Sequence, residues 1–261
     1  MKQLSLALIL TPAAGLWKRS TLLAALCLLA VYGLVRAVEY HNTCLFHAYM
    51  SRFTPVPDVG TFQEARSRAY SGGPRVRRGV LLLHGYSASP QEFELLCQKL
   101  QKAGIAYYAP QLTGFGDNDL GLLREVRAED WMRDALNAYD TLAAFTDEVS
   151  VLGHSNGGAL ATFVAENRPV KHLILSGPNI LPEESDLIFK RLLNTWIVGS
   201  LLQDLVPVFK KPTRAGRVLD VDTLDPAAAQ RSFHDPALPT NSLRALWDVQ
   251  DRVDVTKARF G

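Results

Sequence analysis

Ser155 has the surroundings expected of a nucleophile. It stands between Gly153 and Gly157 in the sequence Gly-His-Ser-Asn-Gly. A serine hydroxyl is a weak nucleophile at neutral pH, and it attacks an acyl carbon only when a base takes its proton. If this serine does chemistry, the fold must therefore bring a histidine and a carboxylate to it.

The residues around Ser155 predict a sharp turn between a strand and a helix. A short apolar run at 148–153 precedes the serine, and a helical pattern begins at 157. The G-x-S-x-G signature requires this context, because the two glycines leave room for a strained turn that lifts the serine above the sheet. The N–H groups at the start of the helix favour negative charge beside the serine. Neighbouring side chains on a sharp turn point in different directions, so we expect His154 to pack beneath the turn rather than act as the base.

A second candidate segment follows the apolar run at 79–85. The tetrahedral intermediate of acyl transfer carries an oxyanion, which needs two preorganised backbone donors. We expect one donor to be the N–H of Asn156, directly after the serine, and the other to be the N–H of Tyr86. Gly85 would let this second backbone segment approach a substrate.

Strands and helices alternate along the rest of the chain. This order predicts an α/β fold with a mostly parallel sheet, helices on both faces and ligands at the carboxyl ends of the strands. An early strand is possible within 61–73. The predicted strands are 79–85, 105–112, 148–153 and 170–178, and the predicted helices include 89–104 and 128–145.

The N-terminal region predicts a membrane segment. Residues 21–35 carry no charge, and with its flanks the run 21–38 is long enough to span a bilayer. A cleaved signal peptide and a buried helix are the alternatives. Lys2, Lys18 and Arg19 precede the run, so we expect residues 1–20 to be cytoplasmic and the remainder to lie on the periplasmic or extracytoplasmic side. Residues 39–60 are predicted to be a linker.

The composition excludes several classes of protein. The chain has 261 residues, of which 48% are hydrophobic and 21% charged, and its formal net charge of +2 is too small to indicate nucleic-acid binding. Three cysteines do not form a disulfide framework, and Cys97 falls on the apolar stripe of a predicted helix. No zinc spacing is present, so we predict no metal site.

Four stretches together resemble the α/β-hydrolase superfamily, and within it the bacterial carboxylesterases and monoacylglycerol lipases of the serine-aminopeptidase-like group. They are GVLLLHGYSASPQEF, YYAPQLTGFGDN, AEDWMRDALNAYDTL and SVLGHSNGGALA. The resemblance implies Ser155 as nucleophile, Tyr86 and Asn156 as oxyanion donors, and hydrolysis of a small-molecule or lipid ester without a cofactor. It also implies a core at 61–178 and a cap over the active site at 179–242, where the apolar run 187–209 suggests a helix beside a small basic patch. Residues 243–261 would form a core helix.

The acid and the base that the resemblance implies are not identified within the chain. They should follow the serine in the order Asp or Glu, then His. His172 falls at the amino end of a predicted strand, and His234 reads as a cap or surface residue. Three aspartates near the end have helical spacing and read as solvated charges of a helix face: Asp248, Asp251 and Asp254.

Two explanations for the missing partners remain open. In the first, the sequence is a fragment of a longer chain that contains the acid and the histidine. In the second, the protein is a hydrolase relative that has lost both residues. We favour the first, because a sheet that ends in an uncovered parallel strand exposes unpaired edge groups. The first predicts a membrane-anchored serine hydrolase that cleaves carboxylic esters. The second predicts an acyl-ligand-binding or scaffold protein. Thioester hydrolysis and acyl transfer fit the same residues, and neither the acyl length nor the oligomeric state can be read from the sequence.

Overall fold

The computed structural model describes residues 7–57, 59–181, 187–188, 190–191, 195, 206–210 and 225–261. The chain divides into two compact units, Met1–His41 and Asn42–Gly261. One helix, α1 (Ala7–Met50), extends from the first unit into the second.

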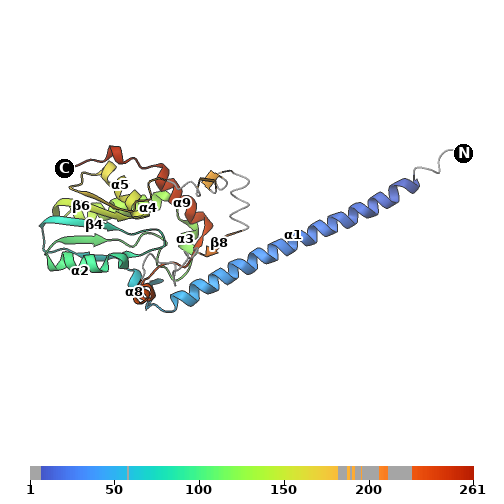
Figure 1. Ribbon diagram of the computed structural model, residues 1–261, viewed down its shortest axis with the longest axis horizontal. Helices are drawn as coiled ribbons and strands as arrows, with labels where there is room; N and C mark the ends of the chain where they lie inside the picture. Colours follow the sequence, from blue (N-terminus) through green and yellow to red (C-terminus); the bar gives the residue numbers. More distant parts are fainter. Residues whose placement is uncertain are drawn as a thin grey trace. The chain divides into compact units, whose positions relative to one another are not determined.

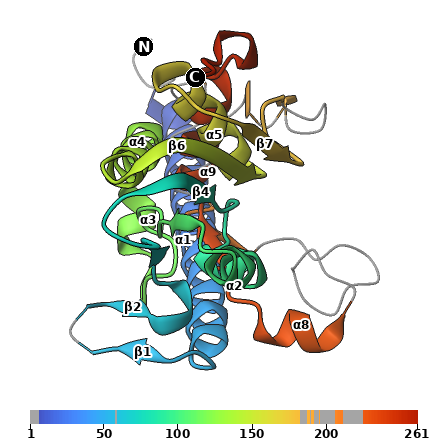
Figure 2. The ribbon, with the colours of Figure 1, turned by 90° about the vertical axis from the view of Figure 1, so that its left-hand side faces the viewer.

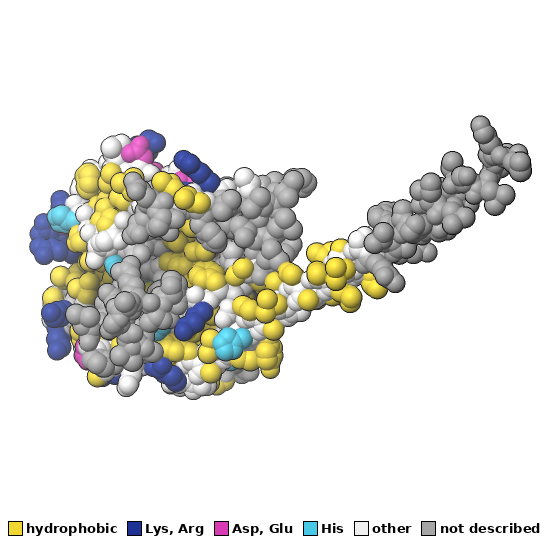
Figure 3. Space-filling view, turned by 45° about the vertical axis from the view of Figure 1, so that its right-hand side comes forward, with side chains coloured by type: hydrophobic (Ala, Val, Ile, Leu, Met, Phe, Trp, Pro, Cys, Tyr) yellow, Lys and Arg dark blue, Asp and Glu magenta, His cyan; other side chains and the backbone are white. Residues whose placement is uncertain are grey.

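Within the first unit, α1 presents apolar side chains to solvent. The stretch Ser20–Met50 is long and apolar enough to cross a membrane, a criterion that signal sequences near an N-terminus also meet. Leu22, Leu28 and Leu34 are each more than 60% exposed. Figure 3 shows such hydrophobic side chains along the described part of the helix.

In the second unit, the helix continues into the segment predicted as a linker. Residues 39–50 are helical, because Phe46 and Met50, one turn apart on the helix, are both buried. They join an aromatic cluster with Phe53, Phe62 and Phe233. Burial against this cluster explains why a polar-looking segment before two prolines stays helical. A short hairpin follows, formed by β1 (Pro55–Val56) and β2 (Thr61–Phe62), and then η1 (Gln63–Ala65).

The predicted sheet forms the centre of the second unit. Its strand order is β3-β5-β4-β6-β7, with β3 antiparallel to β5 and the other neighbours parallel. β7 lies at one edge (Figure 2), and next to it Val170 and Phe260 form an isolated parallel bridge. The strands are β3 (Arg68–Tyr70), β4 (Val76–Leu83), β5 (Ala106–Ala109), β6 (Thr146–His154) and β7 (Leu173–Ser176).

Helices cover both faces of the sheet, as predicted (Figure 1). The side chains of β4 alternate between the two faces, so Leu82 packs towards α2 while Leu81 and Leu83 pack towards α4 and α5. All three are fully buried. The helices are α2 (Glu94–Lys102), preceded by η2 (Pro90–Phe93), then α3 (Gly121–Glu125), α4 (Ala128–Ala143), α5 (Asn156–Asn167) and α9 (Thr240–Asp251).

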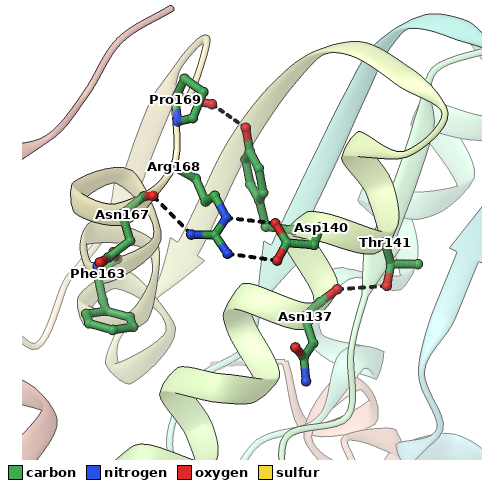
Figure 4. Close-up of polar contacts among 8 residues, drawn as sticks. Asn137, Asp140, Thr141, Phe163, Asn167, Arg168 and Pro169 are labelled. Carbon is green, nitrogen blue, oxygen red and sulfur yellow. Dashed lines mark hydrogen bonds and ion pairs between the residues drawn. The ribbon is translucent and has the colours of Figure 1, made fainter.

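The C-terminal ends of α4 and α5 are joined by polar contacts (Figure 4). Arg168 donates Nε to Oδ1 of Asp140 at 2.7 Å and Nη2 to Oδ2 at 2.8 Å. The hydroxyl of Tyr139 donates to the carbonyl of Pro169. The Arg168 guanidinium holds the pKa of the Asp140 carboxyl below its usual range. This pair fixes the end of α5 that lies farthest from Ser155.

The predicted cap lies mostly outside the described residues. So do most of the predicted helix 187–209 and, of the basic patch formed by Lys210, Lys211, Arg214 and Arg217, all residues but Lys210. Of the described part, Lys190 is buried and its Nζ contacts Asp251 of α9 at 2.5 Å. β8 (Val208–Lys210) pairs with β9 (Ala237–Pro239), and α8 (Pro226–Arg231) stands between them in sequence. The predicted helix 243–261 begins at Thr240 and ends at Asp251, followed by η3 (Val255–Lys257).

Candidate active site

Ser155 lies in the turn between β6 and α5, at the carboxyl end of the sheet. Its backbone has φ 52° and ψ −118°, a conformation that L residues rarely adopt. Three hydrogen bonds hold this backbone: Ser155 N donates to Ser176 O at 3.0 Å, and Ser155 O accepts from Gly158 N and from Asn179 N, each at 2.9 Å. The strained turn predicted from the sequence is therefore present, and β7 and the segment after it hold it in place.

The glycines that flank Ser155 are required by close backbone contacts. A Cβ at Gly153 would lie 2.0 Å from the carbonyl oxygen of Gly157, and a Cβ at Gly157 would lie 1.9 Å from that of Leu83. In both cases the obstacle is backbone, which cannot rotate away as a side chain can. The strand–helix turn can therefore pack against β4 only when both positions are glycine.

The loop after β4, residues 84–89, lies directly against the turn. A Cβ added at Gly85 would be 3.3 Å from Nδ1 of His154 and 3.4 Å from Cβ of Ser155. Ser87 in the same loop has φ 63°, and it and Ser155 are the two non-glycine residues with positive φ in the described part of the chain. Backbone strain of this kind is typical of functional sites.

The structure places Tyr86 in a rigid setting. Its ring meets Phe115 and Trp131 edge to face, at centroid distances of 5.6 and 6.2 Å. The Tyr86 hydroxyl lies 2.5 Å from Oγ of Ser242, which itself donates to the carbonyl of Pro239, so the tyrosine is the donor of the pair. Burial raises the pKa of this phenol. Packing and hydrogen bond together fix the backbone of Tyr86 close to the turn.

Asn156 is the first residue of α5 and is fully buried. Among the described residues, neither its amide oxygen nor its amide nitrogen has a hydrogen-bond partner, and no acceptor contacts the backbone N–H of Asn156 or of Tyr86. The role of these two N–H groups as oxyanion donors therefore stays a prediction.

His84 fixes the start of the loop. Its Nδ1 lies 2.9 Å from Gly85 O and its Nε2 accepts from Leu112 N at 3.2 Å, so the neutral ring with the proton on Nδ1 satisfies both contacts. Burial lowers the pKa of His84 and outweighs the Gly85 carbonyl and the carboxylates of Glu92 and Asp134, which favour the charged ring.

Acid should destabilise the second unit through His84. Because folding lowers the pKa of this group, the unfolded chain binds a proton below pH 6.5 that the folded chain excludes, and stability falls by up to about 1.4 kcal/mol per pH unit. Asp117 has the opposite effect on the pH dependence of stability. Burial and the neighbouring Asp119 raise the pKa of its carboxyl to about 6, so the stability that it contributes is lost as the pH rises through that value. Urea denaturation of Asp117→Asn between pH 7 and 5, followed by tryptophan fluorescence, isolates the first effect. Equal stability at both ends of this range would contradict it.

His154 is not packed beneath the turn, contrary to the sequence prediction. Its side chain is 35% exposed and its Nδ1 contacts Oε1 of Glu92, whose side chain is 24% exposed. The sequence could not reveal this contact, because Glu92 lies sixty-two positions earlier and its side chain reaches the turn only after β4 and β6 have paired.

The described contacts of the remaining candidates for an acid and a base are with residues other than Ser155. His172 is exposed before β7 and contacts Ser150 of β6 at 3.0 Å, as expected for the amino end of a strand. His234 is buried, contrary to a surface position, and its Nδ1 lies 2.8 Å from the Tyr49 hydroxyl. Of the three aspartates, Asp248 is partly buried with a raised pKa, Asp251 contacts Lys190, and Asp254 caps η3 beyond the helix.

Comparison with known proteins agrees with this geometry. The profile of the serine aminopeptidase family matches residues 74–255, well over half of the chain. The chain belongs to this family of α/β-hydrolases. As a member of the serine aminopeptidase family, it has the α/β-hydrolase fold that its sequence predicts.

Several known proteins are similar to parts of the chain. It is 32% identical over 91 residues to a thermostable monoacylglycerol lipase of a Bacillus species, covering 35% of this chain and 36% of that protein. It is 31% identical over 111 residues to a pyrethroid hydrolase of Sphingobium wenxiniae, covering 40% and 39%. The chain thus spans about two fifths of the length of the curated relatives it matches. A solved structure of a metagenome-derived lipolytic enzyme shares the fold, with a TM-score of 0.56, 22% identity and coverage of 73% and 69%.

Proposed function

We propose that this protein is a serine hydrolase that cleaves carboxylic esters through an acyl-enzyme on Ser155. The observation that carries the proposal is the strained backbone of Ser155 between β6 and α5, facing the loop at Gly85. A chance serine at a strand–helix turn would have no reason to occupy a conformation that costs about 1–3 kcal/mol. The named lipase and hydrolase relatives support an ester as the substrate class.

In this mechanism Ser155 Oγ attacks the ester carbonyl and forms a tetrahedral intermediate. The N–H groups of Tyr86 and Asn156 stabilise its oxyanion, helped by the positive N-terminal end of the twelve-residue helix α5. The intermediate then expels the alcohol, which takes up the proton that the serine hydroxyl gave to the base. Water hydrolyses the acyl-enzyme, which releases the carboxylic acid and restores the Ser155 hydroxyl. No cofactor is needed for these steps, since all the bonds that change are acyl and hydroxyl bonds.

The base of this reaction is not assigned to a histidine of the sequence. His84 uses both ring nitrogens to hold the loop, and His154 contacts Glu92. His172 contacts Ser150, and His234 contacts Tyr49. The mechanism requires a base at Ser155 Oγ, typically a histidine oriented by a carboxylate, and an activated serine reacts with a fluorophosphonate.

We further propose that α1 anchors the protein in a membrane. The apolar surface of Ser20–Met50 supports this, and the basic residues before it favour a cytoplasmic N-terminus with the hydrolase unit on the periplasmic or extracytoplasmic side. The segment 179–242 would then act as the cap that receives the acyl chain. Fractionation of membranes and protease accessibility of the hydrolase unit in sealed vesicles test this arrangement.

A fluorophosphonate probe tests the proposed nucleophile. The probe should label the protein expressed from its natural gene, and labelling should disappear in Ser155→Ala. Ser150→Ala is the matched control, because Ser150 lies on the same strand but faces His172, and it should be labelled as strongly as the natural protein. Labelling that persists in Ser155→Ala would refute the assignment, and no labelling of the natural protein would indicate a serine that is not activated.

A further inference from the structure

The carboxylate of Glu92 contacts one residue in each of the two segments that form the candidate active site. Its Oε2 accepts a hydrogen bond from the N–H of Gly85 at 3.0 Å, and its Oε1 contacts Nδ1 of His154. Gly85 directly precedes Tyr86, and His154 directly precedes Ser155. One side chain therefore bridges the residue before the proposed oxyanion donor and the residue before the proposed nucleophile.

Glu92 is itself held in a fixed position. It belongs to η2, where Ser89 Oγ accepts from Gln91 N at 3.3 Å and Glu92 N donates to Ser89 O at 3.0 Å. Pro90 and Phe93, on either side of it in η2, are buried. Gln91 is also fixed, because its side-chain oxygen accepts from Phe233 N at 2.6 Å. The carboxylate therefore extends from a rigid support rather than from a loose loop.

The distance between the two bridged segments is critical for the chemistry. A Cβ added at Gly85 would lie 3.4 Å from the Cβ of Ser155, so the two segments are close enough that a small shift changes their contacts. A displacement of about 1 Å between a nucleophile and its supporting groups can lower a rate about 100-fold. Charge-assisted hydrogen bonds are stronger than neutral ones and set such distances well.

We propose that Glu92 is a positioning residue, which holds the loop at Gly85 against the turn at His154 and so fixes the oxyanion donor relative to Ser155. The inference rests on the proposed function, since it concerns the geometry of the same reaction. Glu92 contacts neither substrate nor reacting atoms. Its loss should slow the chemical step while leaving substrate binding largely intact.

Kinetics of ester hydrolysis by the protein in detergent test this role, with 4-nitrophenyl butyrate as the substrate. Glu92→Ala should lower kcat about 10- to 100-fold with KM changed less than about twofold. Binding of a trifluoromethyl ketone, which forms a tetrahedral adduct with the serine, should weaken by a similar factor. Glu94→Ala is the matched control, because Glu94 is an exposed carboxylate two residues away and should keep natural kcat.

A double-mutant cycle with His154 separates positioning from general destabilisation. If Glu92 acts through His154, His154→Ala should also lower kcat. The factor by which the double variant lowers kcat should then be much smaller than the product of the two single factors. Independent, multiplicative effects on kcat would overturn the proposal. So would natural kcat in Glu92→Ala, or an equal loss of kcat in Glu94→Ala.

A conservative variant covers the case in which Glu92→Ala does not fold. Glu92→Gln keeps an acceptor for Gly85 N–H but loses the charge facing His154, so kcat should fall about three- to tenfold at unchanged KM. Natural kcat in this variant would then overturn the proposal. Failure of the proposed function looks different, because turnover in the unmodified protein would then be absent or would persist in Ser155→Ala.

Discussion

Gly157→Ala should prevent the second unit from folding. The new Cβ would lie 1.9 Å from the carbonyl oxygen of Leu83 and 2.4 Å from its carbonyl carbon, where real Cβ contacts are essentially never found below 3.0 Å. To relieve the contact, α5 would have to move away from β4, which would open the centre of the core. We expect a loss of at least about 4 kcal/mol, comparable to the largest effects of single substitutions. The yield of folded protein and its thermal unfolding temperature measure this.

Two further variants make the Gly157 experiment specific. Gly153→Ala should be as damaging, because its Cβ would lie 2.0 Å from the Gly157 carbonyl oxygen. Gly121→Ala is the control, since the nearest atom to its Cβ is the flexible end of the Asp119 side chain at 2.8 Å. A Gly157→Ala protein that unfolds at the natural temperature would show that α5 does not approach β4 as described.

Ser155→Gly should abolish ester turnover and stabilise the protein. Removing the nucleophile should lower kcat at least about 10,000-fold, as is typical when the nucleophile of a triad is lost. Glycine adopts φ 52° without a steric penalty, so the substitution relieves backbone strain. This gain should exceed the entropic cost of ordering a glycine, and the free energy of unfolding should rise by about 1 kcal/mol. Turnover and thermal unfolding are measured on the same samples.

Ser155→Ala is the matched comparison for strain. It removes the hydroxyl but keeps the Cβ, so turnover should be lost without the gain in stability. Equal stability of the Gly and Ala variants would show that the turn is not strained. Turnover that survives in either variant would show that Ser155 is not the nucleophile.

The sequence was sufficient to predict the order of the core elements and the turn at Ser155. These features depend on local patterns: apolar runs for β4 and β6, a Ser-Pro start for the segment at Ser89, and glycines at 153 and 157. The predicted boundaries shifted by a few residues. For example, the predicted strand 105–112 ends at Ala109, and the helix predicted from Ser89 begins as the 3-10 helix η2 before α2.

Features that depend on tertiary contacts could not be predicted in the same way. Residues 39–50 are helical because Phe46 and Met50 are buried against residues far along the chain, including Phe233. The contact between Glu92 and His154 likewise joins two elements that meet only in the folded sheet. The one available signal was an acidic residue early in the predicted helix 89–104, which alone does not identify a partner.

The parallel pairing of β4 with β6 has a consequence during synthesis. Leu81, Leu82 and Leu83 of β4 are fully buried in the folded protein. Each residue of β4 is made about seventy residues before its partner in β6, as for Val76 and Thr146. At usual elongation rates this interval is roughly 4–14 s. During that interval the three leucines at the end of β4 have no partner on the β6 side. A newly made chain therefore exposes an aggregation-prone segment for seconds, and slower elongation or the absence of chaperones should lower the yield of this protein before its stability changes.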